Sequence, residues 1–242
     1  MSLTHIPSPV PRPGAKKEAL MKKYSLTDET TRVSGNILYR IKAEISFGNI
    51  RKGQLGGYVE KETSLSHQMN AWVYGDARVY GNAGVYGNAA VYGNARVYGD
   101  AWVYGNAGVS GNAEISGNAE ISGNARVYGN ASVSGNARVH EKARVYGKAR
   151  VSGDASVSED ARVYGNARVY GNAEVSKLSL VNIIGLNWNI TISDYHIQIG
   201  CELHTIEQWE KFTDKEILNM DSNSLNWWKD HRAIILKIAK QR

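Results

Sequence analysis

Apolar side chains recur along most of this chain with an unbroken period of six residues. Val or Ile occupies every sixth position from Val73 to Val175, which makes 18 positions without an insertion. Ala follows four residues after each of them as far as Ala173, and Gly-Asn or Gly-Asp lies between the two in most units. A fixed period of this kind is typical of a repeat protein in which each unit packs on its neighbours.

The period predicts a triangular coil. In a short strand such as Arg-Val-Tyr, the middle side chain points to one side and the outer two point to the other. Gly and Asn turn the corner, since both accept a positive φ, and Ala returns to the interior, where only a small side chain fits. Three hexads close one coil, so we expect an all-β parallel β-helix of about six regular coils, roughly 29 Å long at ~4.8 Å per coil.

Two rougher units precede the regular series. Val59 with Thr63, and Leu65 with Met69, repeat the apolar spacing before a two-residue insertion. After the last regular unit, at Val175, the hexad pattern is lost within a few residues. We therefore expect the β-helix to span residues 59–181.

The segments before the repeat predict a leader and a β cap. Residues 1–20 contain all four prolines and are expected to form a flexible, Pro-rich leader. Residues 21–58 alternate apolar and polar positions on both sides of the turn signal Ser34-Gly35-Asn36, which predicts a hairpin. Such a cap would cover the strand edges at the open end of a β-helix.

Residues 182–242 are expected to form a C-terminal strand and a helical cap. The stretch NWNITIS alternates like a strand. Within TIEQWEKFTDKEILNM, Thr205 followed three residues later by Gln208 predicts a capping box at a helix start. A second helix is expected after Asp221 or Ser222.

Charge and cysteine content narrow the range of functions. The formal charge is +6, but residues 71–176 carry 10 Lys/Arg against 9 Asp/Glu, a balance that disfavours nucleic acid as the partner. With Cys201 as the single cysteine, no intramolecular disulfide forms, and we expect a cytoplasmic protein. No run of about 18 apolar residues is present, so no membrane association is expected.

Residues 18 apart should stack into columns on the outside of the coils. On the first side, the residues that come directly before each repeated Val form one such column. It begins with Trp72, and we expect all of its side chains to face solvent. The residues that we expect to form a binding surface on this side are Tyr74, Tyr92, Tyr128, Tyr146, Tyr164, Arg126, Arg144 and Arg162. Tyr and Arg are enriched at interface hot spots. Stacked Tyr columns also stabilise a β ladder by themselves, which is the alternative interpretation.

The hexads resemble the left-handed parallel β-helix of the hexapeptide-repeat superfamily. More specifically, LYRIKAEISFGNIRKGQLGGYVEKE, the VYGNAR array and IGCELHTIEQWEKF resemble the YdcK-like family of bacterial and phage or prophage proteins, which are labelled transferases. The likeness covers residues 21–240. It implies left-handed coils, and its superfamily implies a CoA-dependent acyltransferase with a surface histidine and a loop that interrupts the coils.

The residues themselves favour a different function. The 18 hexads run without a loop, and the only candidate base among them is His140, so acyl transfer with His140 as base is the alternative. We expect instead a non-catalytic, rigid interaction module of phage or prophage type, without a cofactor. Its partner would be a host or phage protein, and we expect a homo-oligomer, for which a trimer is one arrangement.

One cluster in the C-terminal region suggests metal binding. His196, Cys201 and His204 lie close together in YHIQIGCELHT. Three candidate ligands at this spacing do not match a zinc motif. We therefore expect these residues to pack within the cap and predict no metal site.

Overall fold

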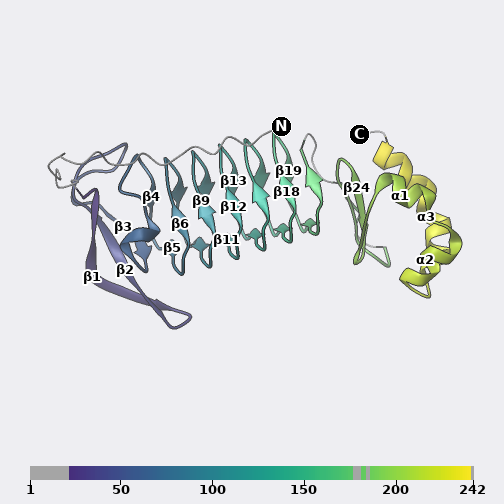
Figure 1. Ribbon diagram of the computed structural model, residues 1–242, viewed down its shortest axis with the longest axis horizontal. Coiled ribbons are helices and arrows are strands. Elements are labelled where there is room, and N and C mark those ends of the chain that lie inside the picture. The colour runs from purple at the N-terminus through teal and green to yellow at the C-terminus, as the bar shows by residue number, and fades with distance from the viewer. Residues whose placement is uncertain (1–21, 177–180, 184–185, 241–242) are drawn as a thin grey trace, which may run out of the picture.

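The computed structural model describes residues 22–176, 181–183 and 186–240. The predicted leader, residues 1–20, lies outside the described residues. The molecule is an elongated parallel β-solenoid with a hairpin at one end and helices at the other (Figure 1). Within the described part of the chain, no helix combines the length and apolar character needed to cross a bilayer.

Three parallel sheets form the sides of the solenoid, here called faces 1, 2 and 3. Face 1 comprises β4 (Trp72–Val73), β7 (Ala90–Val91), β10 (Gly108–Val109), β13 (Arg126–Val127), β16 (Arg144–Val145) and β19 (Arg162–Val163). Face 2 comprises β3 (Leu55–Val59), β5 (Arg78–Val79), β8 (Arg96–Val97), β11 (Glu114–Ile115), β14 (Ser132–Val133), β17 (Arg150–Val151) and β20 (Arg168–Val169). Face 3 comprises β6 (Gly84–Val85), β9 (Trp102–Val103), β12 (Glu120–Ile121), β15 (Arg138–Val139), β18 (Ser156–Val157) and β21 (Glu174–Val175).

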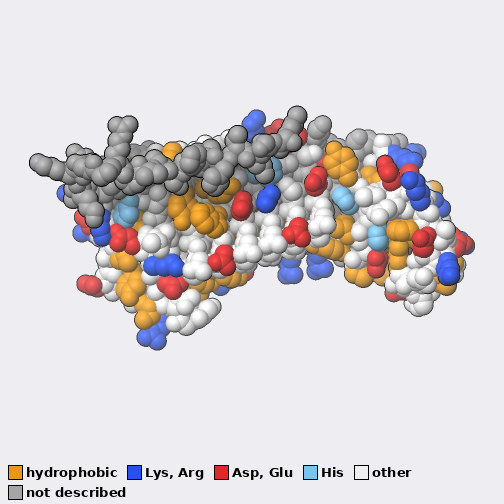
Figure 2. Space-filling view, in the orientation of Figure 1, with side chains coloured by type: hydrophobic (Ala, Val, Ile, Leu, Met, Phe, Trp, Pro, Cys, Tyr) orange, Lys and Arg blue, Asp and Glu red, His pale blue; other side chains and the backbone are white. Residues whose placement is uncertain are grey.

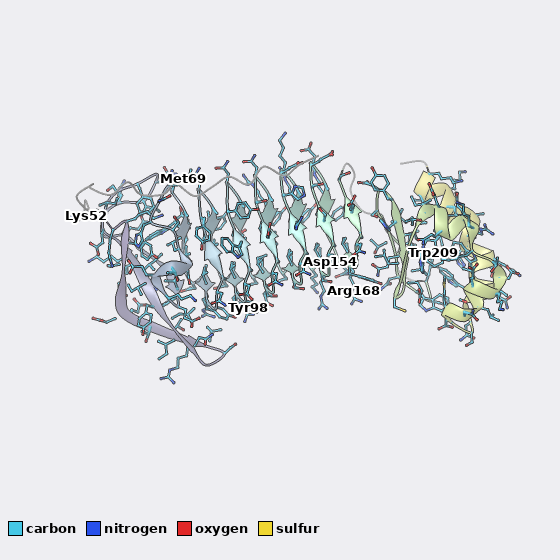
Figure 3. All side chains as sticks on the ribbon, in the orientation of Figure 1. Lys52, Met69, Tyr98, Asp154, Arg168 and Trp209 are labelled. Atoms are coloured by element: carbon cyan, nitrogen blue, oxygen red, sulfur yellow. The ribbon has the colours of Figure 1, made fainter. Side chains whose placement is uncertain are left out.

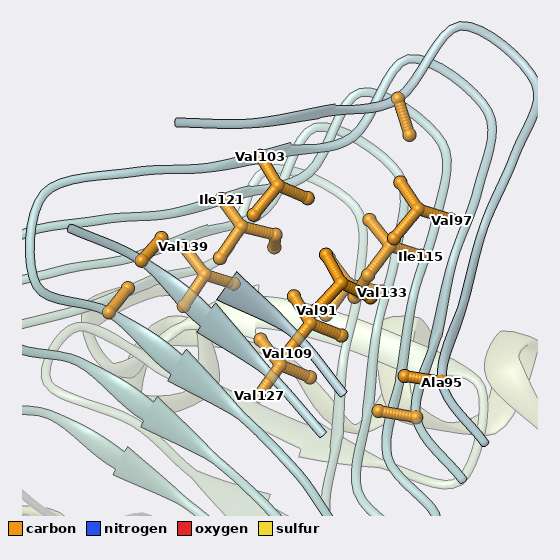
Figure 4. Close-up of a cluster of buried hydrophobic side chains, with 14 of the residues drawn as sticks. Val91, Ala95, Val97, Val103, Val109, Ile115, Ile121, Val127, Val133 and Val139 are labelled. Carbon is orange, nitrogen blue, oxygen red and sulfur yellow. The ribbon is translucent and has the colours of Figure 1, made fainter. Parts of the chain in front are cut away.

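The strands pair in register at a spacing of 18 residues. Val109, for example, pairs with Val91 on one side and with Val127 on the other. The Val and Ala positions of the hexads are 0–3 % exposed, and the Val or Ile side chains of the three faces converge on the solenoid axis (Figure 4). The predicted parallel β-helix and its core are therefore confirmed.

The solenoid has about seven turns, because the two rough early units belong to it. Val59 pairs in parallel with Val79 on face 2, and Leu65 forms a parallel bridge with Val85. The short helix η1 (Glu62–Ser64) connects these two units. The sequence of these two units departs from the regular hexad, but together they add nearly one further coil to the solenoid.

The corners show that Gly and Asn have different roles. The corner glycines adopt a positive φ, such as 74° at Gly99, but the corner asparagines are not among the described residues with positive φ. Their amides instead form ladders between coils, as when Asn118 Nδ2 donates to Asn136 Oδ1 at 2.9 Å. The expectation that both residues supply positive φ was wrong for Asn. At two corners, Glu141 and Glu159 occupy the position of Gly with φ of 59° and 51°.

At the N-terminal end, the predicted hairpin is β1 (Tyr24–Val33) with β2 (Asn36–Ala43), and it extends face 2 through β3. It changes the environment of Trp72, which is 0 % exposed and has edge contacts with the rings of Tyr24 and Phe47. The expectation that Trp72 faces solvent was therefore wrong. The start of the hairpin, at Tyr24, and the loop after it, at Phe47, bury a side chain whose repeat position is otherwise on the outside.

The C-terminal region is a separate antiparallel sheet with three helices. Its elements are β22 (Val181–Ile183), β23 (Ile190–Ile192), β24 (His196–Ile199), β25 (Glu202–Thr205), α1 (Ile206–Lys211), α2 (Asp214–Met220) and α3 (Ser224–Lys240). The predicted capping box at Thr205 and Gln208 is present. The first helical segment divides into α1 and α2 because Thr213 starts a second capping box with Glu216. These elements have a core of their own, which includes Ile197, Trp209 and Trp228.

Candidate functional site

Face 1 brings the predicted arginines together on three consecutive coils. Arg126 pairs with Arg144, and Arg144 pairs with Arg162, in the parallel ladder of β13, β16 and β19. All three side chains are exposed. Each is followed two residues later by a tyrosine, and we call these six residues the Tyr/Arg ladder: Arg126, Tyr128, Arg144, Tyr146, Arg162 and Tyr164.

The tyrosine rings of the ladder stack face to face. The ring centroids of Tyr128 and Tyr146 are 4.9 Å apart with an angle of 1° between the rings. Those of Tyr146 and Tyr164 are 5.4 Å apart at 14°. Tyr164 is 40 % exposed at the end of the stack. Stacking of this kind stabilises the coils and also presents a row of ring edges and hydroxyls to solvent.

The arginines of the ladder have no acidic partner on the solenoid. Among the residues that the structure describes, no salt bridge involves Arg126, Arg144 or Arg162. Like charges on adjacent paired strands repel one another, and the coils hold them at about 4.8 Å intervals. An acidic group brought to this surface would relieve that repulsion.

The other two tyrosines predicted for this surface lie apart from the ladder. Tyr74 and Tyr92 contact each other edge to face at 5.9 Å, and Ser110 separates them from Tyr128. Tyr74 is half-buried against the core, and burial, followed by the neighbouring Tyr92, raises its pKa. The predicted surface is therefore two patches, of which only the Tyr/Arg ladder combines rings with cations.

A comparison with protein families supports the sequence resemblance for the repeat region. The family model described as YdcK Beta solenoid repeat matches residues 71–87, 89–105, 119–134, 125–141, 143–159 and 161–176. The repeats within residues 71–176 are therefore similar to the YdcK β-solenoid repeat. A search of curated proteins found no match to the chain. The transferase label and the phage origin stay predictions.

His140 occupies a surface position on face 3 of the solenoid. Its Nε2 lies 3.3 Å from Ser156 Oγ, and its Nδ1 lies 3.9 Å from Glu141 Oε1. It lines neither of the two large hollows described below. The structure therefore shows His140 with polar neighbours from two coils and outside both of these hollows.

The residues considered for metal binding lie in the C-terminal sheet. No group of three or more His, Cys, Asp or Glu suited to a metal ion occurs in the described ranges. His204 lies 3.0 Å from Glu202 Oε2 through its Nε2 and contacts the ring of Trp209. Burial lowers the pKa of His196, against the smaller opposite effect of Glu174.

The structure also contains a site that the sequence interpretation missed. A cleft of about 1090 Å³ separates the last coils from the C-terminal sheet, with Arg150, Arg168 and Trp188 among its lining residues. The one available signal is Lys148, which replaces the corner Asn found one coil before it at Asn130. The other half of the lining comes from residues 187–201. These residues lie outside the hexad repeat, so its period does not predict where they stand relative to the coils.

Proposed function

We propose that this protein is a rigid, non-catalytic docking module whose Tyr/Arg ladder binds an acidic segment of a protein partner. The observation that carries the proposal is a set of three exposed arginines that form no salt bridge among the described residues, beside a flat stack of tyrosines. Tyr and Arg are the side chains most often found at interface hot spots. The resemblance to YdcK-like proteins supports a phage or prophage origin and a partner from the host or the phage.

The solenoid supports docking because it holds the ladder in place before binding. Arg144 N donates to Ala161 O at 2.8 Å, and Tyr146 N donates to Val163 O at 2.9 Å. The rings of the ladder are already stacked. A preorganised surface loses little conformational entropy when a partner binds.

Self-association is part of the proposal. We infer a homo-oligomer, with a trimer as one arrangement. A symmetric contact between two ladders would bring like charges together, which is unfavourable. The contact between copies should therefore use another surface and leave the ladder free.

The test compares two arginines at the same repeat position on different faces. Full-length protein, Arg144→Gln and the control Arg138→Gln on face 3 are used to capture partners from a bacterial host lysate, and captured proteins are identified by mass spectrometry. We expect one partner whose affinity falls at least tenfold in Arg144→Gln, stays within twofold in Arg138→Gln, and weakens as salt is raised.

Two outcomes would contradict the proposal. The first is a partner that binds both variants equally, because the ladder would then have no role. The second is acetyl-CoA binding together with acyl transfer that is lost in His140→Ala. That result would establish the acyltransferase alternative.

A further inference from the structure

The cleft between the last coils and the C-terminal sheet is strongly cationic. Lys148, Arg150 and Arg168 line it, and none of its described lining residues is Asp or Glu. Figure 3 labels Arg168 at the lower edge of the last coils, near the C-terminal unit. All three cations are exposed, and no salt bridge involves them in the described part of the chain. A ligand of this cleft should carry negative charge.

The remaining lining supplies amides and aromatic rings. Asn166, Asn187, Asn189 and Gln198 contribute amides, and Tyr164 and Trp188 contribute rings. Gln198 is 6 % exposed. Its Nε2 donates to Gly200 O at 3.0 Å, while its Oε1 has no hydrogen-bond partner among the described residues. This oxygen has almost no contact with solvent, so the exposed amides of Asn166, Asn187 and Asn189 are the ones available to a ligand.

The cleft continues into a groove along face 2. A second hollow of about 830 Å³ shares Arg150 with the cleft and extends to Arg96 and Arg78. The described residues of the two linings include five cations (Arg78, Arg96, Lys148, Arg150, Arg168) and one carboxylate, Glu114, which pairs with Arg96. The six strands from β5 to β20 place Arg78 and Arg168 about 24 Å apart. Figure 2 shows Lys and Arg side chains that project from the lower edge of the solenoid.

We propose that this groove and cleft bind an acidic oligosaccharide with carboxylates on successive rings. The cations would pair with carboxylates, the amides would exchange hydrogen bonds with hydroxyls, and Trp188 and Tyr164 offer apolar faces for sugar rings. A small anion would use the cations alone, whereas an extended acidic sugar uses all three kinds of lining residue. The proposal goes beyond the docking function and shares only Tyr164 with the Tyr/Arg ladder.

The experiment measures binding to full-length protein by calorimetry. The probes are hexagalacturonate, its methyl-esterified form without charge, and a hexamer of sialic acid. At least one acidic hexamer should bind, and methyl esterification should weaken galacturonate binding at least tenfold. Absence of binding by both acidic hexamers at millimolar concentration would overturn the proposal. So would an oligothymidylate of equal charge that binds as tightly, because the site would then recognise any polyanion.

Variants locate the site and separate it from the ladder. The double variant Arg150→Gln/Arg168→Gln changes two exposed side chains and should weaken binding at least tenfold, while the matched control Arg126→Gln/Arg144→Gln should stay within twofold. The opposite pattern would contradict the cleft as the site. Loss of partner capture only in the control variant would support docking at the ladder independently of this result.

The single cysteine supplies a second readout. Cys201 lines the cleft and is exposed and free. The bound oligosaccharide should therefore slow alkylation of Cys201 severalfold, and this protection should disappear in Arg150→Gln/Arg168→Gln. Binding without any protection would place the oligosaccharide outside the cleft.

Discussion

At its N-terminal end the solenoid continues directly into the hairpin, whereas at its C-terminal end a separate sheet covers the last coil. The hairpin shares the backbone ladder of face 2, since β2 pairs with β3 and β3 pairs in parallel with β5. The strands β22–β25 form a sheet of their own. Both ends protect open strand edges from pairing with other chains, but they do so by different interactions.

The N-terminal end is closed by backbone bonds and a shared core. Tyr58 N donates to Ala77 O at 2.9 Å, and Tyr24, Ile41 and Trp72 belong to the same core cluster as the Val and Ala of the coils. The hairpin and the solenoid should therefore unfold as one unit.

The C-terminal end is held mainly by side chains. Tyr170 donates its hydroxyl to Gly200 O at 3.0 Å, Ser176 Oγ donates to Asp194 Oδ2 at 2.9 Å, and Leu203 packs against the last coils. The helices and the sheet have a separate core. The difference teaches that a shared backbone ladder joins the hairpin and the coils into one core, whereas two separate cores meet beside a cleft that is open to a ligand.

The largest expected effect tests the shared core at the N-terminal end. Trp72→Ala removes a fully buried side chain and should lower the free energy of unfolding by about 3–5 kcal/mol. Trp102→Ala is the matched control, because Trp102 occupies the same repeat position but is 46 % exposed and stacks on Tyr86. Trp102→Ala should lower the free energy of unfolding by less than about 1 kcal/mol. Equal losses in urea unfolding would show that the hairpin does not share a core with the coils.

A smaller effect is expected from pH. Burial lowers the pKa of Lys23 to about 8, and its Nζ donates to Ala71 O at 2.8 Å. In the unfolded chain this pKa is about 10.4, so between these values the unfolded state binds more protons. The free energy of unfolding should therefore rise with pH across this window, by about 1–2 kcal/mol.

The measurement is urea unfolding at pH values of about 7.5, 8.5 and 9.5. The rise should be absent in Lys23→Met, which removes the titrating group. Above about pH 10 the trend should reverse, because burial and then the Glu62 carboxylate raise the pKa of Tyr24. An identical pH dependence of the free energy of unfolding in both proteins would show that burial does not lower the pKa of Lys23.

The smallest expected effect tests the C-terminal junction. Tyr170→Phe removes the hydrogen bond to Gly200 and should cost about 0.5–1.5 kcal/mol. Because the junction depends on such side-chain contacts, amide hydrogen exchange should accelerate in β24 and β25 and stay unchanged in β1–β3. Tyr98→Phe changes the same repeat position on face 2 and should leave both ends unaffected. Faster exchange at both ends in Tyr170→Phe would contradict two separately stabilised units.

The Tyr/Arg ladder was predictable from the sequence because the repeat itself fixes its geometry. Residues 18 apart lie on neighbouring coils, so the alignment of Arg126, Arg144 and Arg162 follows from counting. Counting failed at Trp72, whose partners Tyr24 and Phe47 come from outside the repeat. The repeat period also could not predict the cleft, because Arg168 belongs to the hexad repeat and Trp188 lies in a segment beyond it.

By itself the sequence determined the parallel β-solenoid, its buried Val and Ala, and the columns on its faces. It did so because a short period forces each residue type into one position on every coil. Only the tertiary structure decided how the two ends are closed, that Trp72 is buried, and that a cationic cleft lies beside the last coils. These features depend on contacts between segments that share no repeat, and such contacts are set by the packing of whole surfaces.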